Sequence, residues 1–200
     1  MSRATAGEER GYTLVELLVV MVILGVVLSG LTAVFVSGSN ASVDLNRRFA
    51  AQQEARVALD RIRGDIHCAS AAQAQTINSY PGLKLAVGNC YASTPTVAWC
   101  AVQVTSSPPH YALYRTTGTT SLCTSSDASR VLVADYLTTS SAFTTATIPQ
   151  YSLQNVGVDF TVSVHPTTKT RDAYRLTDSI VARNSTRCYT VGGCSVPSVP

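Results

Sequence analysis

Charged residues are scarce in this 200-residue chain. Only 14% of the residues are Asp, Glu, Lys or Arg, and 15 basic residues against 12 acidic ones give a net charge of +3. This charge is too small to predict a protein that binds nucleic acid through its overall electrostatic attraction. Hydrophobic residues make up 46% of the chain, which excludes a largely disordered protein. The length fits one medium-sized domain with a small additional segment.

The sequence also lacks the residue clusters that enzymes use. The histidines His67, His110 and His165 are far from one another in the sequence. There is no Gly-x-Ser-x-Gly motif, no phosphate-binding loop, no His-Glu-x-x-His motif and no dinucleotide-binding glycine pattern. We therefore expect a protein that is not an enzyme, with no catalytic residue, no metal site and no cofactor.

The apolar residues are concentrated near the N-terminus, where no charged residue occurs between Leu17 and Val36. A helix over this stretch would be about 30 Å long, which matches the hydrocarbon core of a bilayer. The stretch is longer than the apolar region of a cleavable secretory signal. Taken alone, it predicts an uncleaved signal anchor with a single membrane-spanning helix.

A short motif precedes the apolar stretch and reads Gly11-Tyr12-Thr13-Leu14-Val15-Glu16. Its carboxylate lies at the edge of a region in which a central charge would cost on the order of 3 kcal/mol. Thr13 and Glu16 have the spacing of a capping box, in which both side chains accept hydrogen bonds from free amides at the start of a helix. A capping box does not account for Gly11 and Tyr12.

This motif resembles the N-terminus of type IV prepilins and pseudopilins, in which Gly, an aromatic residue, Thr-Leu-x-Glu and a long apolar helix follow one another. The resemblance implies that a prepilin peptidase cuts between Gly11 and Tyr12 and methylates the new N-terminus at Tyr12. It also implies that Glu16, with Thr13 and Leu14 beside it, sets the register of the subunit in a filament. A buried carboxylate needs a partner, and the amino terminus of a neighbouring subunit can be that partner.

A second helical pattern follows the apolar stretch. Between Asp44 and about Gln75, apolar residues recur every three or four positions and form one helix face, at Ala55, Ala58, Leu59, Ile62, Ile66 and Ala69. The remaining helix surface carries two possible i,i+4 ion pairs, Arg56 with Asp60 and Arg61 with Asp65. The segment 37–40, Ser-Gly-Ser-Asn, interrupts the pattern and is expected to bend the helix.

After Pro81 the sequence changes to short β-type runs separated by Ser, Thr, Pro and Gly. The clearest run is 156–164, in which apolar residues alternate with other residues. The expected strands are 83–87, 97–104, 111–115, 130–137, 156–164 and 174–182, and the Ser/Thr-rich segments 116–129 and 138–147 are expected to be loops. Strands with no intervening helices predict an antiparallel sheet, which the apolar helix face would cover.

These elements predict an α+β, pilin-like fold with a long N-terminal helix packed on a C-terminal antiparallel sheet. We expect four segments: a cleaved leader (1–11), a transmembrane helix that later lies in a filament core (12–37), an extracytoplasmic amphipathic helix (38–80) and a β-sheet domain with disulfide-bonded loops (81–200).

The six cysteines all follow the apolar stretch, at Cys68, Cys90, Cys100, Cys123, Cys188 and Cys194. None has Cys-x-x-Cys spacing, so disulfides are favoured over a zinc site. The sequence leaves several pairings open, and we favour 68 with 90, 100 with 123, and 188 with 194 because each closes a short loop. Disulfides form in oxidising compartments. They therefore place the domain outside the cytoplasm, an orientation that the balanced charges of the leader do not give.

The sequence thus predicts a structural minor pilin or pseudopilin of a type IV pilus, a competence pilus or a type II secretion filament. The segments 58–66 and 181–184 resemble W-type minor pilins and J-type pseudopilins. The resemblance implies three kinds of partner: a prepilin peptidase, other pilin-like subunits and the pilus or secretion assembly machinery. It also implies a single-pass protein of the bacterial inner membrane with an extracytoplasmic C-terminal domain, which enters a periplasmic or cell-surface filament after assembly.

Two alternatives remain open at the level of sequence. A pilus-associated adhesin or DNA-binding receptor would use the same scaffold, and the basic cluster for DNA would be Arg171, Arg175, Arg183 and Arg187. Asp172 and Asp178 lie among these residues, so few phosphates would be reached. A signal-anchored extracytoplasmic enzyme would need a pocket of titratable groups that the sequence does not indicate.

Overall fold

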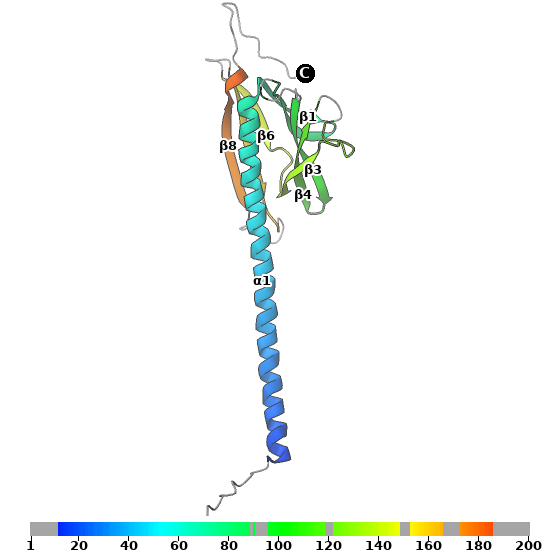
Figure 1. Ribbon diagram of the computed structural model, residues 1–200, viewed down its shortest axis with the longest axis vertical. Coiled ribbons are helices and arrows are strands. Elements are labelled where there is room, and N and C mark those ends of the chain that lie inside the picture. Colours follow the sequence, from blue (N-terminus) through cyan, green and yellow to red (C-terminus); the bar gives the residue numbers. More distant parts are fainter. Residues whose placement is uncertain are drawn as a thin grey trace, which may run out of the picture. The chain divides into compact units, whose positions relative to one another are not determined.

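The computed structural model describes residues 12–88, 90, 96–118, 122–148, 153–165 and 173–185. Among these residues, one long helix, α1 (Leu14–Cys68), is followed by strands and by a short 3-10 helix, η2 (Arg183–Ser185). The strands are β1 (Ala71–Ile77), β2 (Tyr80–Ala86), β3 (Thr96–Ser106), β4 (Pro109–Thr117), β5 (Val131–Leu137), β6 (Phe143–Ile148), β7 (Leu153–Val162) and β8 (Tyr174–Ala182). The α+β fold class and the long N-terminal helix are confirmed (Figure 1).

The chain divides into two compact units, residues 1–46 and 47–200, and α1 contributes residues to both. The segment 37–40, which was expected to bend the helix, is α-helical and does not end it. The first unit therefore contains the N-terminal part of α1, and the second contains the remainder of the helix with the whole sheet.

The end of α1 differs from the sequence prediction. The helix ends at Cys68, not near Gln75, and β1 already starts at Ala71 inside the segment expected to be helical. Asn78 and Ser79 both have positive φ, 47° and 74°, and form the two-residue turn that joins β1 to β2. Ala71 and Ala72 are buried against the rest of the domain. Tertiary packing thus overrides the helix propensity of this alanine-rich segment.

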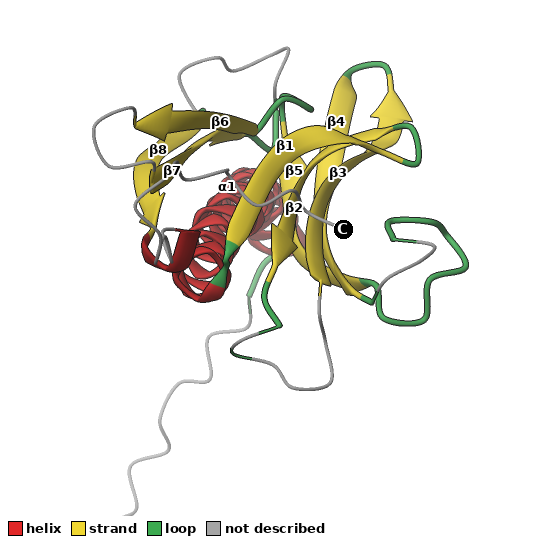
Figure 2. Cartoon of the chain, turned by 90° about the horizontal axis from the view of Figure 1, so that it is seen from above, coloured by secondary structure: helices red, strands yellow, loops and turns green. Residues whose placement is uncertain are grey.

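The strands form one antiparallel sheet in the order β1-β2-β3-β4-β5-β7-β6, and β8 pairs with β7. Figure 2 shows this sheet curled around the C-terminal part of α1. The curl brings β1 near β6 and β7, where the Ala72 amide donates to Gln154 Oε1 at 2.6 Å and the Ala74 amide donates to Thr145 Oγ1 at 3.4 Å. These side chains satisfy two amides of an edge strand.

The six strands predicted from the sequence are all present, with boundaries that shift by a few residues. Two further strands were not predicted. β1 lies in the segment expected to be helical, and β6 lies in the Thr-rich segment 138–147 that was expected to be a loop. Thr is a good strand former because its branched side chain packs well on a pleated surface, so composition alone did not separate strand from loop here.

The apolar helix face predicted from the sequence is confirmed. Ala55, Ala58, Ile62 and Ile66 are fully buried and Leu59 is nearly so. They pack in one cluster with residues of the sheet, and the largest fully buried sheet side chains of that cluster are Trp99, Phe160, Leu83, Leu85, Leu113 and Leu137. The alanines allow the helix to approach the sheet closely, and the isoleucines fill the remaining space.

A buried carboxylate also joins α1 to the sheet. Asp65 is only 3% exposed, and its Oδ2 accepts hydrogen bonds from Trp99 Nε1 at 3.0 Å and from Arg115 Nε at 2.8 Å. A second guanidinium nitrogen, Arg115 Nη2, donates to Oδ1 at 3.1 Å. The predicted surface pair with Arg61 is therefore wrong, because Asp65 faces the sheet and bonds to β3 and β4.

The predicted pair of Arg56 with Asp60 is also replaced. Arg56 Nε donates to Tyr174 Oη at 3.2 Å, and its guanidinium lies 5.4 Å from the centre of that ring. Asp60 instead accepts from Arg63, three residues along the helix, at 2.8 Å. The polar side chains on this part of α1 thus reach β8 as well as one another, and the i,i+4 spacing alone did not reveal this.

We expect Asp65→Ala to lower the free energy of unfolding by about 3 kcal/mol, because it removes the carboxylate that a buried indole N–H and the partly buried guanidinium of Arg115 share. Chemical unfolding of the full chain in detergent can be followed by the fluorescence of Trp99, the single tryptophan. Asp60→Ala is the matched control, since that side chain is 72% exposed, and it should cost less than about 1 kcal/mol. Equal losses in the two variants would contradict the role of Asp65.

Candidate functional site

The helix α1 begins inside the N-terminal motif. Leu14 is its first residue, and Thr13 caps it. The Glu16 amide donates to Thr13 Oγ1 at 3.3 Å, and the Thr13 carbonyl accepts from the amides of Glu16 and Leu17 at 3.1 and 3.2 Å. The predicted cap is therefore present on the Thr13 side, and Tyr12 is 83% exposed just before it. Gly11 lies outside the described residues.

Glu16 lies in the first turn of α1 and is exposed. A carboxylate is favourable there because the free amides of the first turn give the helix N-terminus a partial positive charge. The structure thus brings together four of the residues singled out from the sequence, Tyr12, Thr13, Leu14 and Glu16, at the start of one helix. The carboxylate of Glu16 is thus exposed, one helical turn from Tyr12, the residue at which the mature N-terminus is expected.

The part of α1 that follows is covered by apolar side chains. All residues from Leu14 to Val36 are exposed, and α1 is long and apolar enough, by length and composition, to cross a membrane. The hydroxyl groups in this stretch bond to the helix itself, Ser29 to the Val26 carbonyl and Thr32 to the Leu28 carbonyl, each at 2.8 Å. Their donors therefore impose no unsatisfied polar cost in an apolar environment.

Such a surface is not suited to water. A helix that is apolar all round is normally surrounded by lipid or by other protein. Among the described residues, none of this stretch is covered by the rest of the chain. The site that the N-terminal unit offers is therefore the whole apolar helix surface, with one carboxylate at its beginning.

Two disulfides reinforce the second unit. Cys68, the last residue of α1, bonds to Cys90 after β2, with Cα atoms 5.6 Å apart. Cys100 of β3 bonds to Cys123 in the β4–β5 connection, with Cα atoms 6.1 Å apart. Both pairs were predicted from the sequence. The third predicted pair, Cys188 with Cys194, lies outside the described residues.

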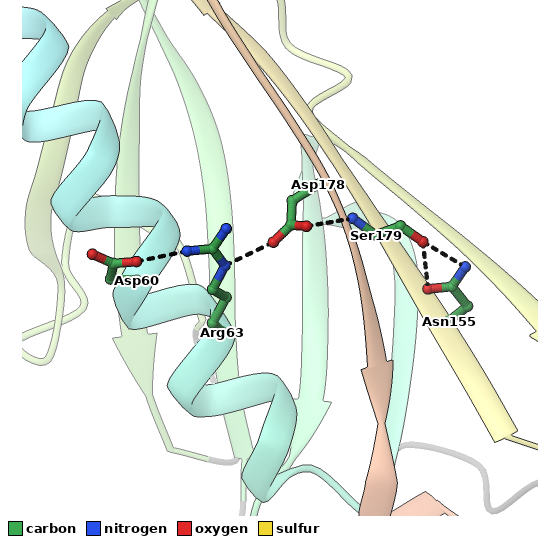
Figure 3. A network of polar contacts seen from close by, with 5 residues as sticks. All are labelled: Asp60, Arg63, Asn155, Asp178 and Ser179. Atoms are coloured by element: carbon green, nitrogen blue, oxygen red, sulfur yellow. Dashed lines mark hydrogen bonds and ion pairs between the residues drawn. The ribbon is translucent and has the colours of Figure 1, made fainter.

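A polar network joins α1 to β8 on the surface of the second unit (Figure 3). Arg63 Nε donates to Asp178 Oδ2 at 2.7 Å, and Arg63 Nη1 donates to Asp60 at 2.8 Å. The other Asp178 oxygen accepts from the amide of Ser179 at 2.8 Å. Ser179 and Asn155 of β7 then exchange hydrogen bonds of 2.9 and 3.0 Å. This network links the helix to the last two strands of the sheet.

The network changes the acidity of its members. The hydrogen bond from Arg63 lowers the pKa of Asp178 below its ordinary value; partial burial opposes this and the Ser179 amide adds to it. The same hydrogen bond raises the pKa of Arg63 above its ordinary value. On β7 and β8, Arg175 forms two hydrogen bonds with Asp159 and lowers the pKa of that carboxyl.

The other candidate groups do not form a reaction centre. Thr105 Oγ1 lies 2.7 Å from His110 Nδ1, but its hydroxyl donates to the Pro108 carbonyl at 2.8 Å, and Asp135 is 3.6 Å from His110 Nε2. These residues fasten the β3–β4 hairpin to β5. Over the described part of the chain, no group of three or more His, Cys, Asp or Glu side chains is placed to hold a metal ion.

The structure describes two of the four arginines of the basic cluster considered for DNA. Arg175 bonds to Asp159, and Arg183 lies in η2. Arg171 and Arg187, like Asp172, lie outside the described residues. The guanidinium of Arg175 is thus already engaged with a carboxylate, which reduces what it offers to a phosphate.

Sequence reasoning missed two residues that hold the helix to the sheet. Asp65 lies three positions after Ile62 and thus on the apolar face, and Asp178 lies between Leu176 and Ile180 at the inward-facing positions of β8. In both cases the signal was a carboxylate at a position whose periodicity predicts burial. The partners, Arg115 and Arg63, were too distant in sequence to be found by spacing.

Comparison with known proteins identifies the N-terminal site. Residues 8–32 match the family described as Prokaryotic N-terminal methylation motif. Over these residues the chain is similar to type IV prepilins and pseudopilins. The match covers the residues around Gly11 and the first turns of α1, and it does not extend into the sheet. No curated protein and no solved structure matches the chain.

We expect Asp178→Asn to reduce the free energy of unfolding at neutral pH by roughly 0.5–1 kcal/mol, since a partly exposed ion pair is screened by water. A carboxyl whose pKa is lowered by folding contributes stability above its unfolded pKa and loses it as the pH falls through the folded value. The difference between wild type and variant should therefore shrink below a pH of about 4.

The control is a double-mutant cycle with Arg63→Gln, measured by chemical unfolding at several pH values. In the Asp178→Asn variant, the side-chain amide oxygen can still accept a hydrogen bond from the Ser179 amide. The cycle therefore measures the interaction between the two charged groups and not the loss of that hydrogen bond. A wild-type–variant difference that does not change between pH 7 and pH 3, or additive effects of the two substitutions, would contradict the proposed source of stability.

Proposed function

We propose that this protein is a minor pilin or pseudopilin, a non-enzymatic subunit of a type IV pilus, a competence pilus or a type II secretion filament. The observation that carries the proposal is the methylation motif at the start of a helix whose apolar side chains from Leu14 to Val36 are all exposed. A membrane anchor needs only the helix. The motif adds a processing site and a carboxylate, which a simple anchor does not require.

Processing removes residues 1–11. A prepilin peptidase cuts between Gly11 and Tyr12, and methylation of Tyr12 completes the mature N-terminus. The position of the helix supports this assignment, because the cap at Thr13 leaves Tyr12 outside α1. A peptidase must bind an extended backbone, and Gly on the N-terminal side of the cut offers no side chain to obstruct that approach.

Assembly uses the surface of α1 that the chain itself leaves uncovered. In the membrane, the residues of segment 12–37 contact lipid, and in the filament they contact the same helix of neighbouring subunits. The carboxylate of Glu16 then forms an ion pair with the amino terminus of a neighbouring subunit, because a carboxylate among apolar helices needs a partner. Thr13 and Leu14 flank that contact and contribute to its register.

The second unit forms the surface domain of the filament. Its two described disulfides support a location outside the cytoplasm, so the subunit is a single-pass inner-membrane protein with its C-terminal domain extracytoplasmic. With no assembled reaction centre in the described residues, its role is to start, cap or modify a fibre through contacts with other pilin-like subunits and with the assembly machinery.

Mass spectrometry of the mature protein tests the proposal. In a host that has its own prepilin peptidase, we expect a chain that begins at Tyr12 and carries one additional methyl group on its N-terminus. Gly11→Val should keep the leader attached, because a branched side chain hinders binding of the extended backbone.

The control for expression is a host without the peptidase, in which both the wild type and Gly11→Val should retain residues 1–11. A wild-type chain that keeps its leader when the peptidase is present would refute the processing step, and a chain cut elsewhere would refute the assignment of Tyr12.

A further inference from the structure

Strand β8 is an edge of the sheet. Its only strand partner among the described residues is β7. On β7, the Asp159 amide donates to the Ala142 carbonyl and the Thr161 carbonyl accepts from the Thr138 amide, both at 2.9 Å. The backbone N–H and C=O groups of the odd-numbered residues of β7 therefore point away from β8, and those of its even-numbered residues point toward β8.

The register then assigns the free edge of β8. Val158 of β7 is opposite Asp178, so the even-numbered residues of β8 form its ladder hydrogen bonds with β7. The backbone groups of Thr177, Ser179 and Val181 point outward. The amide of Ser179 confirms this direction, because it donates to the side chain of Asp178 and not to a strand.

Asp178 satisfies only one backbone amide on this edge. Its Oδ1 caps the Ser179 amide, and its Oδ2 is held by Arg63. Such capping protects an edge strand from unspecific pairing. Among the described residues, no side chain caps the Val181 amide in the same way. Over the described part of the chain, the edge is therefore unpaired at the end of β8 that precedes η2.

A groove runs beside this open end. It is lined by Arg63 and His67 of α1, by residues 178–181 of β8 and by Arg183 of η2, with a volume of about 280 Å³. Figure 3 shows Arg63 reaching from α1 to Asp178, and both residues line the groove. The groove thus has an outward-facing backbone as one wall and basic side chains as the other.

The groove has more cationic donors than carboxylates. Asp178 is its one carboxylate, and both of its oxygens are already bonded. Within the described part of the chain, the side chains of Arg183 and His67 have no hydrogen-bond or ion-pair partner. A carboxylate brought in by a ligand would meet these donors without displacing an existing pair.

We propose that this groove binds an extended acidic segment of a partner subunit. The backbone of the segment continues the sheet by pairing with β8 around Val181, and a carboxylate of the segment binds Arg183, with His67 as a second donor. Strand addition supplies affinity through main-chain hydrogen bonds, and the basic side chains supply the preference for acidic residues. That the partner is another filament subunit rests on the proposed function; the binding itself does not.

The test uses the full chain in detergent and a fluorescein-labelled octapeptide of alternating Thr and Glu, followed by fluorescence anisotropy. We expect saturable binding that weakens about tenfold or more when Glu is replaced by Gln, or when alternate peptide amides are N-methylated. Arg183→Gln should weaken binding by a similar factor. Arg61→Gln, an exposed arginine of α1 outside the groove, is the matched control and should bind as the wild type does.

Three results would overturn the proposal. They are the absence of saturable binding, equal affinity for the N-methylated peptide, and equal affinity of the Arg183→Gln protein. A fourth result comes from a variant truncated after Ser185. If the peptide binds only to this truncated chain, the protein's own C-terminal residues, and not a partner, occupy the edge of β8. Because the assay uses unprocessed protein, its outcome is independent of cleavage at Gly11, so the two proposals can fail separately.

Discussion

Helix α1 carries two kinds of surface, and the rest of the molecule depends on how each of them is covered. From Leu14 to Val36 every side chain is exposed, whereas Ala55, Ile62 and Ile66 are fully buried by the sheet. Among the described residues nothing covers the first surface, which therefore suits lipid or other helices. Under the proposed function this helix passes from lipid into a bundle of neighbouring helices and is apolar in both settings, in keeping with the low charge content of the sequence.

In the second unit, by contrast, the sheet packs on the C-terminal part of α1 and covers it. Apolar burial supplies most of the stability, but polar contacts determine how the helix lies on the sheet. Asp65 fixes α1 to Trp99 and Arg115 in the interior, and Arg63 fixes it to Asp178 at the surface. The disulfide from Cys68 joins the last turn of the helix to the chain after β2. Force on the helix in a filament would therefore be transmitted to the sheet through bonds on several strands.

Local patterns in the sequence predicted the parts of this structure that local physics determines. The alternation in β7, the helix face around Ile62 and the cap at Thr13 each follow from residues a few positions apart. The strands β1 and β6 were missed because their pairing partners, and not their composition, decide their conformation. The burial of Asp65 was missed for the same reason, since its partners lie more than thirty positions away. The N-terminal motif could be recognised in the sequence because it consists of consecutive residues.

The central claim is that the apolar helix becomes a protein interface in which the carboxylate of Glu16 is neutralised by a neighbouring subunit. The most direct measurement is the amount of Glu16→Ala protein in sheared filaments relative to that in the membrane, with Glu54→Ala, an exposed glutamate farther along α1, as the control. The account predicts normal leader cleavage in both variants, wild-type incorporation of Glu54→Ala, and about a tenfold or greater loss of Glu16→Ala from filaments. Wild-type incorporation of Glu16→Ala would contradict it.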